Sequence, residues 1–404
     1  MTHTADVVVV GGGPAGAAAA ITLARQGRDV MVLDRATFPR DKICGDGLTA
    51  GALRMLEDLG LEPSSVPSWK PVDDVVVRSP SGYEVRFPLP RGAGSYAVVA
   101  RRAELDLALI DVARASGAKV RDGHACVAAE ERDDRVVLEV EGIGSVAARY
   151  AVAADGMWSP MRKHLGVAVP GYRGEWHAFR QYFTGVGPRA SEELFVWFEP
   201  DLLPGYAWSF PLPGGRANVG FGIQREGGTV ARVQDMGSLW PQLLRRPHIA
   251  DVLGRDARPE SPHRAWPIPA RVDDIVLATR RTLFAGDAAA ATDPMTGEGI
   301  GQALLSGILA AEAVEAGGLD ALHVMGTYER AVRDALVADH RMSLLLIRAL
   351  RHPKGARTAV RIAGANGWTR RNFARWLFED YPRSIITTPR RWKRGQLTGP
   401  GAYR

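Results

Sequence analysis

The hydrophobic pattern of the first forty residues predicts a strand, a helix and a second strand. Ala5–Val10 is a continuous valine-rich run, which is typical of a strand covered on both faces. Pro14–Gln26 is rich in alanine, as in a buried helix, and Gly27 ends it. Asp29–Leu33 is a second apolar strand. The pattern therefore predicts a βαβ unit of a parallel sheet.

Two later stretches have the same strand character, and each runs directly into a glycine and an aspartate. Tyr150–Ala154 leads into Asp155–Gly156, and Thr282–Ala285 leads into Gly286–Asp287. Gly297–Val314 then has the pattern of a helix. We expect both strands to join the domain that the βαβ unit begins.

Aromatic residues concentrate in the middle of the chain. Of the 30 in the sequence, 12 lie between residues 172 and 221. Segments such as Glu193–Phe198 alternate as strands do when one face is buried. This region therefore predicts an antiparallel sheet in a separate domain, with the first domain's segments on both sides of it.

Length and composition are typical of a globular protein with a large core. The chain has 404 residues, of which 46% are apolar and 24% charged. No apolar run reaches the roughly 18 residues that a membrane span needs. No signal peptide is expected, because Asp6–Val10 already has the pattern of a strand. The only two cysteines, Cys44 and Cys126, suit a reducing compartment, so we expect a cytoplasmic protein, and we expect no metal site.

The charge of the chain is unevenly distributed. Residues 341–404 hold 15 lysines and arginines but only two acids, whereas the whole chain has a net charge of +6. A basic tail on an acidic body indicates an anionic partner. A lipid surface fits better than nucleic acid, because no nucleic-acid-binding motif accompanies the charge. Phe373, Trp376 and Leu377 would share one helix face, which either inserts at a membrane surface or packs on the main body.

A glycine motif follows the first strand. Gly11–Gly16 fits G-x-G-x-x-G between a strand and a helix. Gly11 permits the turn, Gly13 permits close approach of a pyrophosphate, and Gly16 permits close helix–strand packing. Asp34 ends the second strand 21 residues after Gly13, where an acid can bind ribose hydroxyls. Together these features predict a dinucleotide site.

The second half of the chain favours FAD over NAD. Gly286–Asp287 at a strand end can aim a carboxylate at a polyol, while the glycine lets the backbone approach. The turn at Gly297–Ile300 then opens a helix whose amides can face a developing anion. A nicotinamide needs no such second clamp, whereas the ribityl chain and isoalloxazine ring of FAD do.

These motifs resemble those of a known superfamily of flavoproteins. Gly11–Gly16, Asp155–Arg162 and the Gly286–Gly299 stretch are similar to the FAD-binding fold of the para-hydroxybenzoate hydroxylase superfamily. Arg102–Asp106 is similar to its flavin-side arginine at a helix start.

Two further stretches resemble the geranylgeranyl reductase family within that superfamily. Phe38–Leu48 is similar to its P-x-x-K-x-C-G segment, and Tyr206–Pro211 with Gly220 is similar to its Y-x-W-x-F-P…G stretch. The histidine that usually follows Gly-Asp-Ala-Ala in hydroxylases is replaced by Ala290, and the W-x-W-x-I-P run of flavin halogenases is missing. Both departures favour a reductase.

The resemblance implies an α/β fold, α+β overall. Its parts are a Rossmann-like FAD-binding domain of the para-hydroxybenzoate hydroxylase type, an antiparallel-sheet substrate domain and a helical C-terminal region. We expect the FAD-binding domain to comprise residues 1–70, 98–165 and 275–345, the substrate domain to comprise 71–97 and 166–274, and the basic helical region to comprise 346–404.

The resemblance also implies roles for individual residues. Cys44 would lie near the reactive edge of the flavin and take part in catalysis, although a free cysteine is more often a packed hydrophobe. Tyr206, Trp208, Phe210 and Gly220 would form the wall of a cavity for an isoprenoid chain, although an aromatic strand can also be plain core. The motifs and the resemblance together assign the cofactor to Gly11, Gly13, Pro14, Ala15, Gly16, Asp34, Arg35, Lys42, Cys44, Gly45, Arg102, Asp155, Gly156, Gly286, Asp287, Pro294, Gly297, Gly299 and Ile300.

The leading hypothesis is an FAD-dependent reductase that saturates C=C bonds of a geranylgeranyl lipid or of a prenylated quinone side chain. The alternative is an FAD-dependent monooxygenase, or a related halogenase-like enzyme, acting on an aromatic or polyketide-type metabolite. No second G-x-G-x-x-G with helix context occurs in the sequence, so we expect electrons from transiently bound NAD(P)H or from a small redox carrier. We also expect the basic tail to bind the inner face of the cell membrane.

Overall fold

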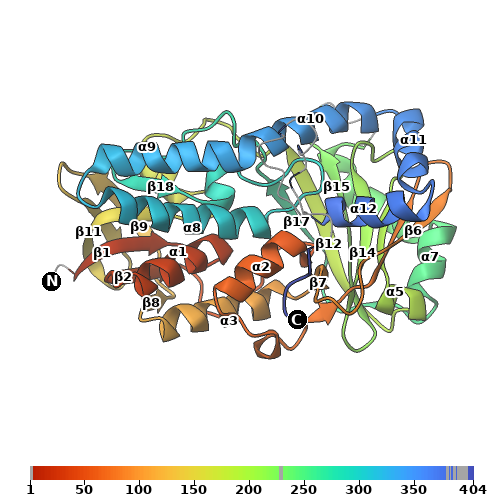
Figure 1. Ribbon diagram of the computed structural model, residues 1–404, viewed down its shortest axis with the longest axis horizontal. Helices are drawn as coiled ribbons and strands as arrows, with labels where there is room; N and C mark the ends of the chain where they lie inside the picture. Colours follow the sequence, from red (N-terminus) through yellow and green to blue (C-terminus); the bar gives the residue numbers. More distant parts are fainter. Residues whose placement is uncertain (1–2, 227–230, 379–381, 383, 385–387, 389–398) are drawn as a thin grey trace.

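The valine-rich segments form the first sheet, at the left of Figure 1. The computed structural model describes residues 3–226, 231–378, 382, 384, 388 and 399–404. Strand β1 lies between β2 and β11 and is parallel to both, so its last residues are buried on both faces. The strand order is β8 (Lys119–Asp122), β2 (Val30–Asp34), β1 (His3–Val10), β11 (Gly144–Ala153), β10 (Val136–Val140) and β9 (Cys126–Glu131), and β18 (Thr282–Phe284) pairs in parallel with β11.

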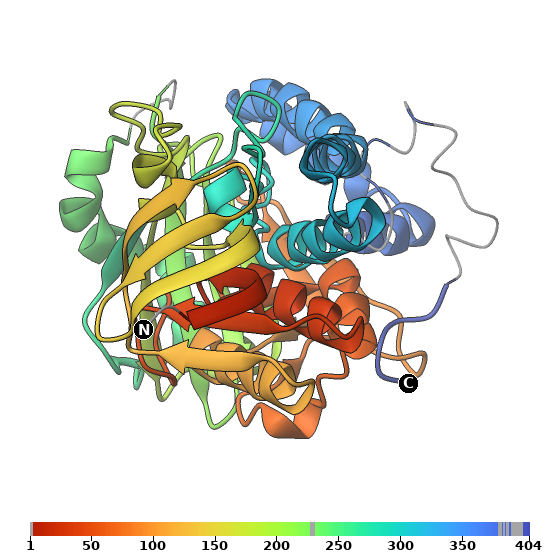
Figure 2. The same cartoon turned by 90° about the vertical axis from the view of Figure 1, so that its left-hand side faces the viewer.

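Helices cover the first sheet and bring its distant segments together. Figure 2 shows the blue-green helix α8 (Ile300–Gly317) close to the red helix α1 (Pro14–Arg25). Their backbones approach so closely that a Cβ on Gly307 would overlap the carbonyl oxygen of Ala15. The remaining helices of this part are α2 (Ala50–Asp58), α3 (Arg102–Ala115), α4 (Pro160–His164) and α9 (Ala321–Val332).

The aromatic region forms a second sheet, at the right of Figure 1. Its order is β16 (Arg258–Pro259), β12 (Trp176–Thr184), β15 (Arg216–Gln224), β14 (Tyr206–Leu212), β13 (Leu194–Trp197), β5 (Asp74–Arg78) and β6 (Glu84–Pro88), and β17 (Arg264–Ile268) also pairs with β12. The expectation of a purely antiparallel sheet is wrong at one point, because β5 and β13 are parallel. No tight turn joins these two strands, and the chain passes through the first sheet between them.

Smaller elements connect the two sheets and cover their outer faces. A small third sheet contains β3 (Gly47–Thr49), β7 (Ala97–Val99) and β4 (Lys70–Pro71). Helices α5 (Pro188–Glu192), α6 (Met236–Leu244) and α7 (Pro247–Leu253) accompany the second sheet.

The helices at the C-terminal end extend from the first sheet to the second. Helix α9 continues through a π-helical turn, Arg333–Val337, into α10 (Ala338–Leu350), and the pair crosses the top of the molecule in Figure 1. Helices α11 (Pro353–Ala363) and α12 (Gly367–Leu377) then lie beside the second sheet. None of the helices that the structure describes is long and apolar enough to cross a membrane.

The apolar face of α12 is turned inward. Phe373 packs on Phe87 of β6 with ring centroids 4.8 Å apart, and Trp376 packs on Phe373. The sequence left open whether this face inserts at a membrane surface or packs on the main body, and the structure shows that it packs on the main body. Within the basic tail, residues 379–381, 383, 385–387 and 389–398 lie outside the described residues.

Candidate active site

A connected cavity of about 1400 Å³ runs from the glycine loop after β1 to helices α10, α11 and α12. A typical pocket for one small ligand has roughly 300–1,000 Å³, so this cavity has room for a cofactor and a second molecule. Its wall contains both the glycine-motif residues and the aromatic strand β14. The two predicted sites are therefore two ends of one space.

The glycine loop has the geometry that a pyrophosphate needs. Gly11 has φ +101°, and a Cβ there would overlap the carbonyl oxygen of Ala154. Gly13 faces open space instead, since the nearest atom to a Cβ would be Nη2 of Arg40, at 3.5 Å. None of the described side chains caps the N-terminus of α1, so its amides are available to an anion.

Two arginines stand over this loop and are fixed by one buried carboxylate. Asp106 accepts two hydrogen bonds from Arg102, at 2.8 and 2.9 Å, and pairs with Nη1 of Arg40 at 3.0 Å. Although burial opposes its charge, the pair with Asp106 raises the pKa of Arg102, which stays a cation. Asp34 holds the loop from the other side by accepting the Gly12 N–H at 2.8 Å.

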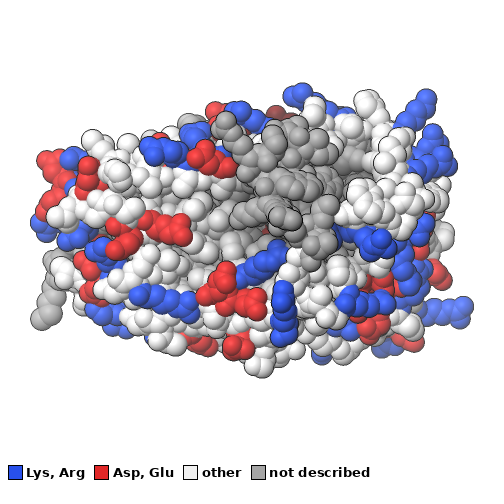
Figure 3. Space-filling model, in the orientation of Figure 1, with Lys and Arg blue, Asp and Glu red and all other residues white. Residues whose placement is uncertain are grey.

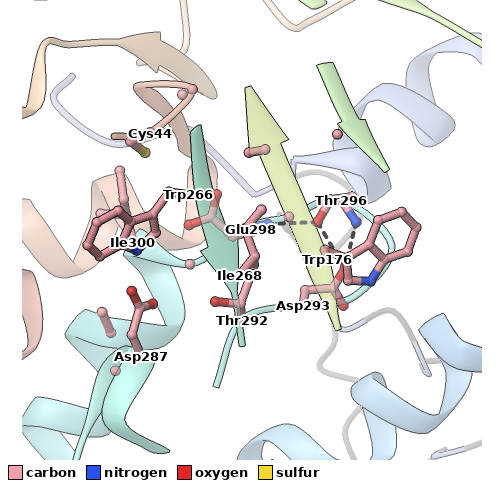
Figure 4. A pocket seen from close by; sticks show the side chains of 18 of the residues that line it. Cys44, Trp176, Trp266, Ile268, Asp287, Thr292, Asp293, Thr296, Glu298 and Ile300 are labelled. Carbon is pink, nitrogen blue, oxygen red and sulfur yellow. Dashed lines mark hydrogen bonds between the residues drawn. The ribbon is translucent and has the colours of Figure 1, made fainter. Parts of the chain in front are cut away.

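The Phe38–Leu48 segment and the Gly286–Asp287 motif meet at Lys42. Its Nζ lies 3.4 Å from Oδ2 of Asp287 and 4.3 Å from the ring centroid of Trp266. Burial lowers the pKa of the Lys42 amine, and the charge of Asp287 opposes that effect. In Figure 4, Cys44 lies on one side of Trp266 and Ile300, and Asp287 lies on the other.

The turn before α8 is held by its own acidic side chains. Asp293 accepts the backbone N–H of Thr296 at 2.9 Å, as Figure 4 shows, and Glu298 accepts that of Gly301. Gly297 has φ +72°, a conformation that ends any helix there, so α8 begins at Ile300 rather than at the predicted Gly297. Glu298 thus occupies one first-turn amide of α8, while Gly299 and Ile300 at the start of the helix line the cavity.

Cys44 lines the cavity between these motifs and the aromatic wall. Its Sγ accepts the backbone N–H of Asp46 at 3.4 Å. Burial raises the pKa of the Cys44 thiol, although Arg102 nearby lowers it. The thiol therefore keeps its proton at neutral pH.

Strand β14 supplies the aromatic wall. Tyr206, Trp208 and Phe210 share one face because side chains alternate along a strand, and all three line the cavity. The ring of Phe210 packs on the Cys44 loop, since a Cβ on Gly45 would lie 3.2 Å from it. The wall thus begins beside the thiol.

Beyond this wall the cavity is lined by apolar side chains of the last helices. They include Leu346, Leu350, Val360, Ile362, Phe373 and Trp376. A cavity that is polar at the nucleotide loop and apolar at the helices can hold a dinucleotide beside a hydrocarbon chain.

The residues present fit FAD. The uncapped N-terminus of α1 and the start of α8 face one cavity, and two arginines stand beside Gly13, where a pyrophosphate would lie. Among the described residues, no group of histidine, cysteine and acidic side chains is placed to hold a metal ion.

Comparison with known proteins agrees with this geometry. The family model described as "FAD binding domain" matches residues 4–201. The menaquinone reductase of Mycobacterium tuberculosis is 37% identical over 367 residues, which are 85% of this chain and 84% of that protein. The digeranylgeranylglycerophospholipid reductase 1 of Methanopyrus kandleri is 32% identical over 330 residues, 77% of this chain and 80% of that protein.

The chain belongs to the geranylgeranyl reductase family of FAD-dependent oxidoreductases. A solved structure described as geranylgeranyl bacteriochlorophyll reductase-like, from Thermoplasma acidophilum, has the same fold with a TM-score of 0.80. It is 20% identical and covers 97% of this chain and 100% of its own. The predicted family, fold class, enzyme class and cofactor of the reductase are thereby confirmed.

Most residues predicted for the reductase site line the cavity. Gly16 and Gly220 are not among the lining residues. Gly16 lies against the backbone of Gly11, as its packing role requires, and Gly220 lies behind the ring of Trp208. Those that do line the cavity are Gly11, Gly13, Pro14, Ala15, Asp34, Arg35, Lys42, Cys44, Gly45, Arg102, Asp155, Gly156, Tyr206, Trp208, Phe210, Gly286, Asp287, Pro294, Gly297, Gly299 and Ile300.

Sequence reasoning missed several polar residues of the reductase. Arg40 and Asp46 stand inside the Phe38–Leu48 segment, which was a usable signal for both. Asp106 could have been found as the i+4 partner of Arg102. Tyr182 on β12 and Asn218 on β15 carry no sequence signal, because only the second sheet brings them to the Cys44 loop.

Proposed function

We propose that the protein saturates C=C bonds in the isoprenoid chain of a lipid, either a prenylated quinone or a geranylgeranyl lipid. The relatives named above are reductases of menaquinone and of digeranylgeranylglycerophospholipid, and both compounds carry such chains. The observation that carries the proposal is that one connected cavity is lined by the nucleotide loop at one end and by apolar side chains at the other.

An isolated alkene offers no oxygen or nitrogen for an enzyme to polarise. Catalysis must therefore come from positioning and from exclusion of water. Trp208 and Phe210 provide a rigid apolar surface beside Cys44, and the helix residues extend it. This lining suits a flexible hydrocarbon that has to be held in one register.

The residues around Cys44 suit the delivery of a proton. Bound FAD in its reduced form supplies a hydride to one alkene carbon. The other carbon needs a proton, and we assign it to the Cys44 thiol, which is neutral and lines the cavity. Electrons for the next turnover come, in this proposal, from NAD(P)H or a small redox carrier.

The lipid enters, in this proposal, between α11 and α12. Ile362 and Trp368 line the cavity, yet their exposed fractions are 65% and 62%. Lysines and arginines gather at the right-hand end of the molecule, where Figure 1 places α11 (Figure 3). An apolar mouth with a basic rim fits the surface of an anionic membrane, where such a lipid resides.

Anaerobic reoxidation of the reduced flavin tests the proposed function. A menaquinol and a geranylgeranyl phospholipid would each be compared with the same lipid bearing a saturated chain. A menaquinol is chosen because its ring is already reduced and cannot accept electrons. We expect at least one unsaturated lipid to reoxidise the flavin while its saturated counterpart does not. Reoxidation only by O2, with a hydroxylated product, would contradict the proposal.

A further inference from the structure

A polar network lies directly behind the Cys44 loop. Asn218 donates its side-chain amide to the backbone carbonyl of Cys44 and to Oδ2 of Asp46, both at 2.8 Å. Its Oδ1 accepts the indole N–H of Trp208 at 3.1 Å. One buried amide therefore connects the thiol loop, a carboxyl group and the aromatic wall.

The two oxygens of the Asp46 carboxyl group have different surroundings. Oδ2 accepts the Tyr182 O–H at 2.7 Å as well as the Asn218 amide. Oδ1 has no hydrogen-bond partner among the described residues, although the side chain is fully buried. A carboxylate with one bare oxygen is costly to bury, whereas a neutral carboxyl with its proton on Oδ1 leaves Oδ2 satisfied. The geometry therefore suits a carboxylic acid.

The backbone of Asp46 lies against the Cys44 thiol. Asp46 has φ +67° and receives the Ala100 N–H on its carbonyl oxygen at 2.9 Å, while its own N–H points to Sγ of Cys44. Asp46 and Cys44 both line the cavity. Aspartate and asparagine tolerate this left-handed conformation better than most residues.

The surroundings of Asp46 raise the pKa of its carboxyl group above the usual value for an aspartate. Burial raises its pKa to about 6, against the hydrogen bonds and charges that lower it. Burial also raises the pKa of the Cys44 thiol above 9. A proton therefore moves downhill from Asp46 to a Cys44 thiolate. The groups that act on Asp46 are Tyr182 and Arg180 on β12, Asn218 on β15, Arg101 and Arg102 at the start of α3, and Cys44 of its own loop.

We propose that Asp46 restores the proton that Cys44 gives up and so serves as the internal proton supply of the reduction. The inference rests on the proposed function. The alkene gains a hydride on one carbon and the thiol proton on the other, as its π bond breaks. The O–H bond at Oδ1 then breaks as a new S–H bond forms, and the carboxylate is reprotonated from solvent.

The test compares first and later turnovers of the FAD-loaded enzyme. Asp46→Asn keeps the size, the φ tolerance and an acceptor for Tyr182. We expect its first turnover to be close to wild type, because Cys44 starts with its proton. Steady-state turnover should fall on the order of 100-fold, and its dependence on pH near 6 should vanish. Glu199→Gln, which removes a buried carboxylate just after β13 that does not line the cavity, should keep the wild-type pH profile.

Tyr182→Phe gives a prediction that a purely structural role would not. It removes a hydrogen bond that stabilises the carboxylate, so the pKa of Asp46 should rise. Wild-type steady-state turnover should fall as the pH rises through about 6, and in Tyr182→Phe this fall should move to higher pH. Infrared spectra of the FAD-loaded protein should show a protonated carboxyl band that titrates near pH 6 and is missing in Asp46→Asn.

The outcomes separate the two proposals. Wild-type enzyme that reduces no lipid would overturn the proposed function and this inference with it. Active wild-type enzyme whose pH profile survives in Asp46→Asn would overturn the inference alone. So would equal loss of first and later turnovers with FAD retained, and so would an infrared band that Asp46→Asn leaves unchanged.

Discussion

Trp208 and Gly220 face each other across β14 and β15, and the indole ring fills the space that any larger residue at 220 would need. A Cβ there would overlap the ring and also the carbonyl oxygen of Phe179. The position of the central aromatic side chain of the wall therefore depends on a glycine that does not line the cavity itself.

Gly220→Ala should displace Trp208 and reduce lipid turnover by about 10- to 100-fold, because small displacements of a positioning surface are costly to catalysis. FAD content should change little, and unfolding should become easier by roughly 1–3 kcal/mol from overpacking. Gly237→Ala, on α6 and away from the cavity, is the control, since its Cβ would meet no atom within 4 Å. Equal effects of the two substitutions would contradict this account of Gly220.

Gly13→Val should abolish FAD binding without unfolding the protein. The new side chain would point into the cavity where the pyrophosphate has to approach. Flavin absorbance and the unfolding temperature of the flavin-free protein are the two measurements. Gly11→Val should instead lower the unfolding temperature, because its Cβ would overlap Ala154. Flavin-replete Gly13→Val would show that the pyrophosphate lies elsewhere.

Cys44→Ala should retain FAD and its reduction but lose most alkene turnover, by a factor on the order of 100, if the thiol delivers the proton. The chain's other cysteine provides the control. Cys126 also lines the cavity, but its Sγ packs against Sδ of Met161 at 3.7 Å, and Cys126→Ala should keep lipid turnover within about twofold of wild type. Turnover of Cys44→Ala that matches this control would make Cys44 a structural residue.

The carboxyl group of Asp46 should make the free energy of unfolding depend on pH. Its pKa rises from 3.8 to about 6 on folding, so the folded protein binds this proton more tightly than the unfolded chain. The resulting stabilisation is complete below pH 4 and is lost as the pH rises towards 6. The total corresponds to about 3 kcal/mol.

Denaturant unfolding between pH 4 and pH 7 measures this effect as a difference between wild type and Asp46→Asn. The free energy of unfolding of the wild type should fall relative to the variant across pH 4 to 6 and then stay level. A constant difference across this range would show that the carboxyl group is ionised throughout.

The basic rim, which includes Arg361 on α11 and Arg371 on α12, should bind anionic vesicles in a salt-sensitive way. Arg361→Glu with Arg371→Glu should weaken co-sedimentation, because each surface cation contributes about 1 kcal/mol near anionic lipid. Arg370 is left intact, since it hydrogen-bonds the carbonyl oxygen of Gly364.

Arg132→Glu with Arg135→Glu is the matched control for the vesicle experiment. This pair carries the same charge change in the turn between β9 and β10, at the opposite end of the molecule from α11. Equal weakening by both pairs, or no binding of wild type at low salt, would contradict the membrane proposal.

The parts of the site that lie in continuous motifs could be predicted from the sequence. Gly11–Gly16 and Gly286–Asp287 could be interpreted from local backbone chemistry, because a turn that requires glycine leaves its mark in the chain. The alternating pattern of β14 likewise placed Tyr206, Trp208 and Phe210 on one face. These predictions needed no knowledge of distant contacts.

Contacts between sheets could not be predicted in this way. Asn218 and Asp46 are 172 residues apart, and their hydrogen bond exists only because β15 passes behind the Cys44 loop. The inward face of α12 had the same amphipathic pattern that a membrane-binding helix has, and only its contact with Phe87 distinguishes the two. The parallel pair β5–β13 was missed for a similar reason, since no local signal sets strand direction.

Mass spectrometry of the lipid recovered from an anaerobic reaction tests the central claim most directly. Reduced, FAD-loaded enzyme would be incubated with a menaquinol and, separately, with a geranylgeranyl phospholipid, and the isoprenoid chain would be fragmented. The account predicts a product that carries two additional hydrogens for each bond reduced, located in the chain. Chains that return unchanged from both lipids, or a product with oxygen inserted once air is admitted, would contradict it.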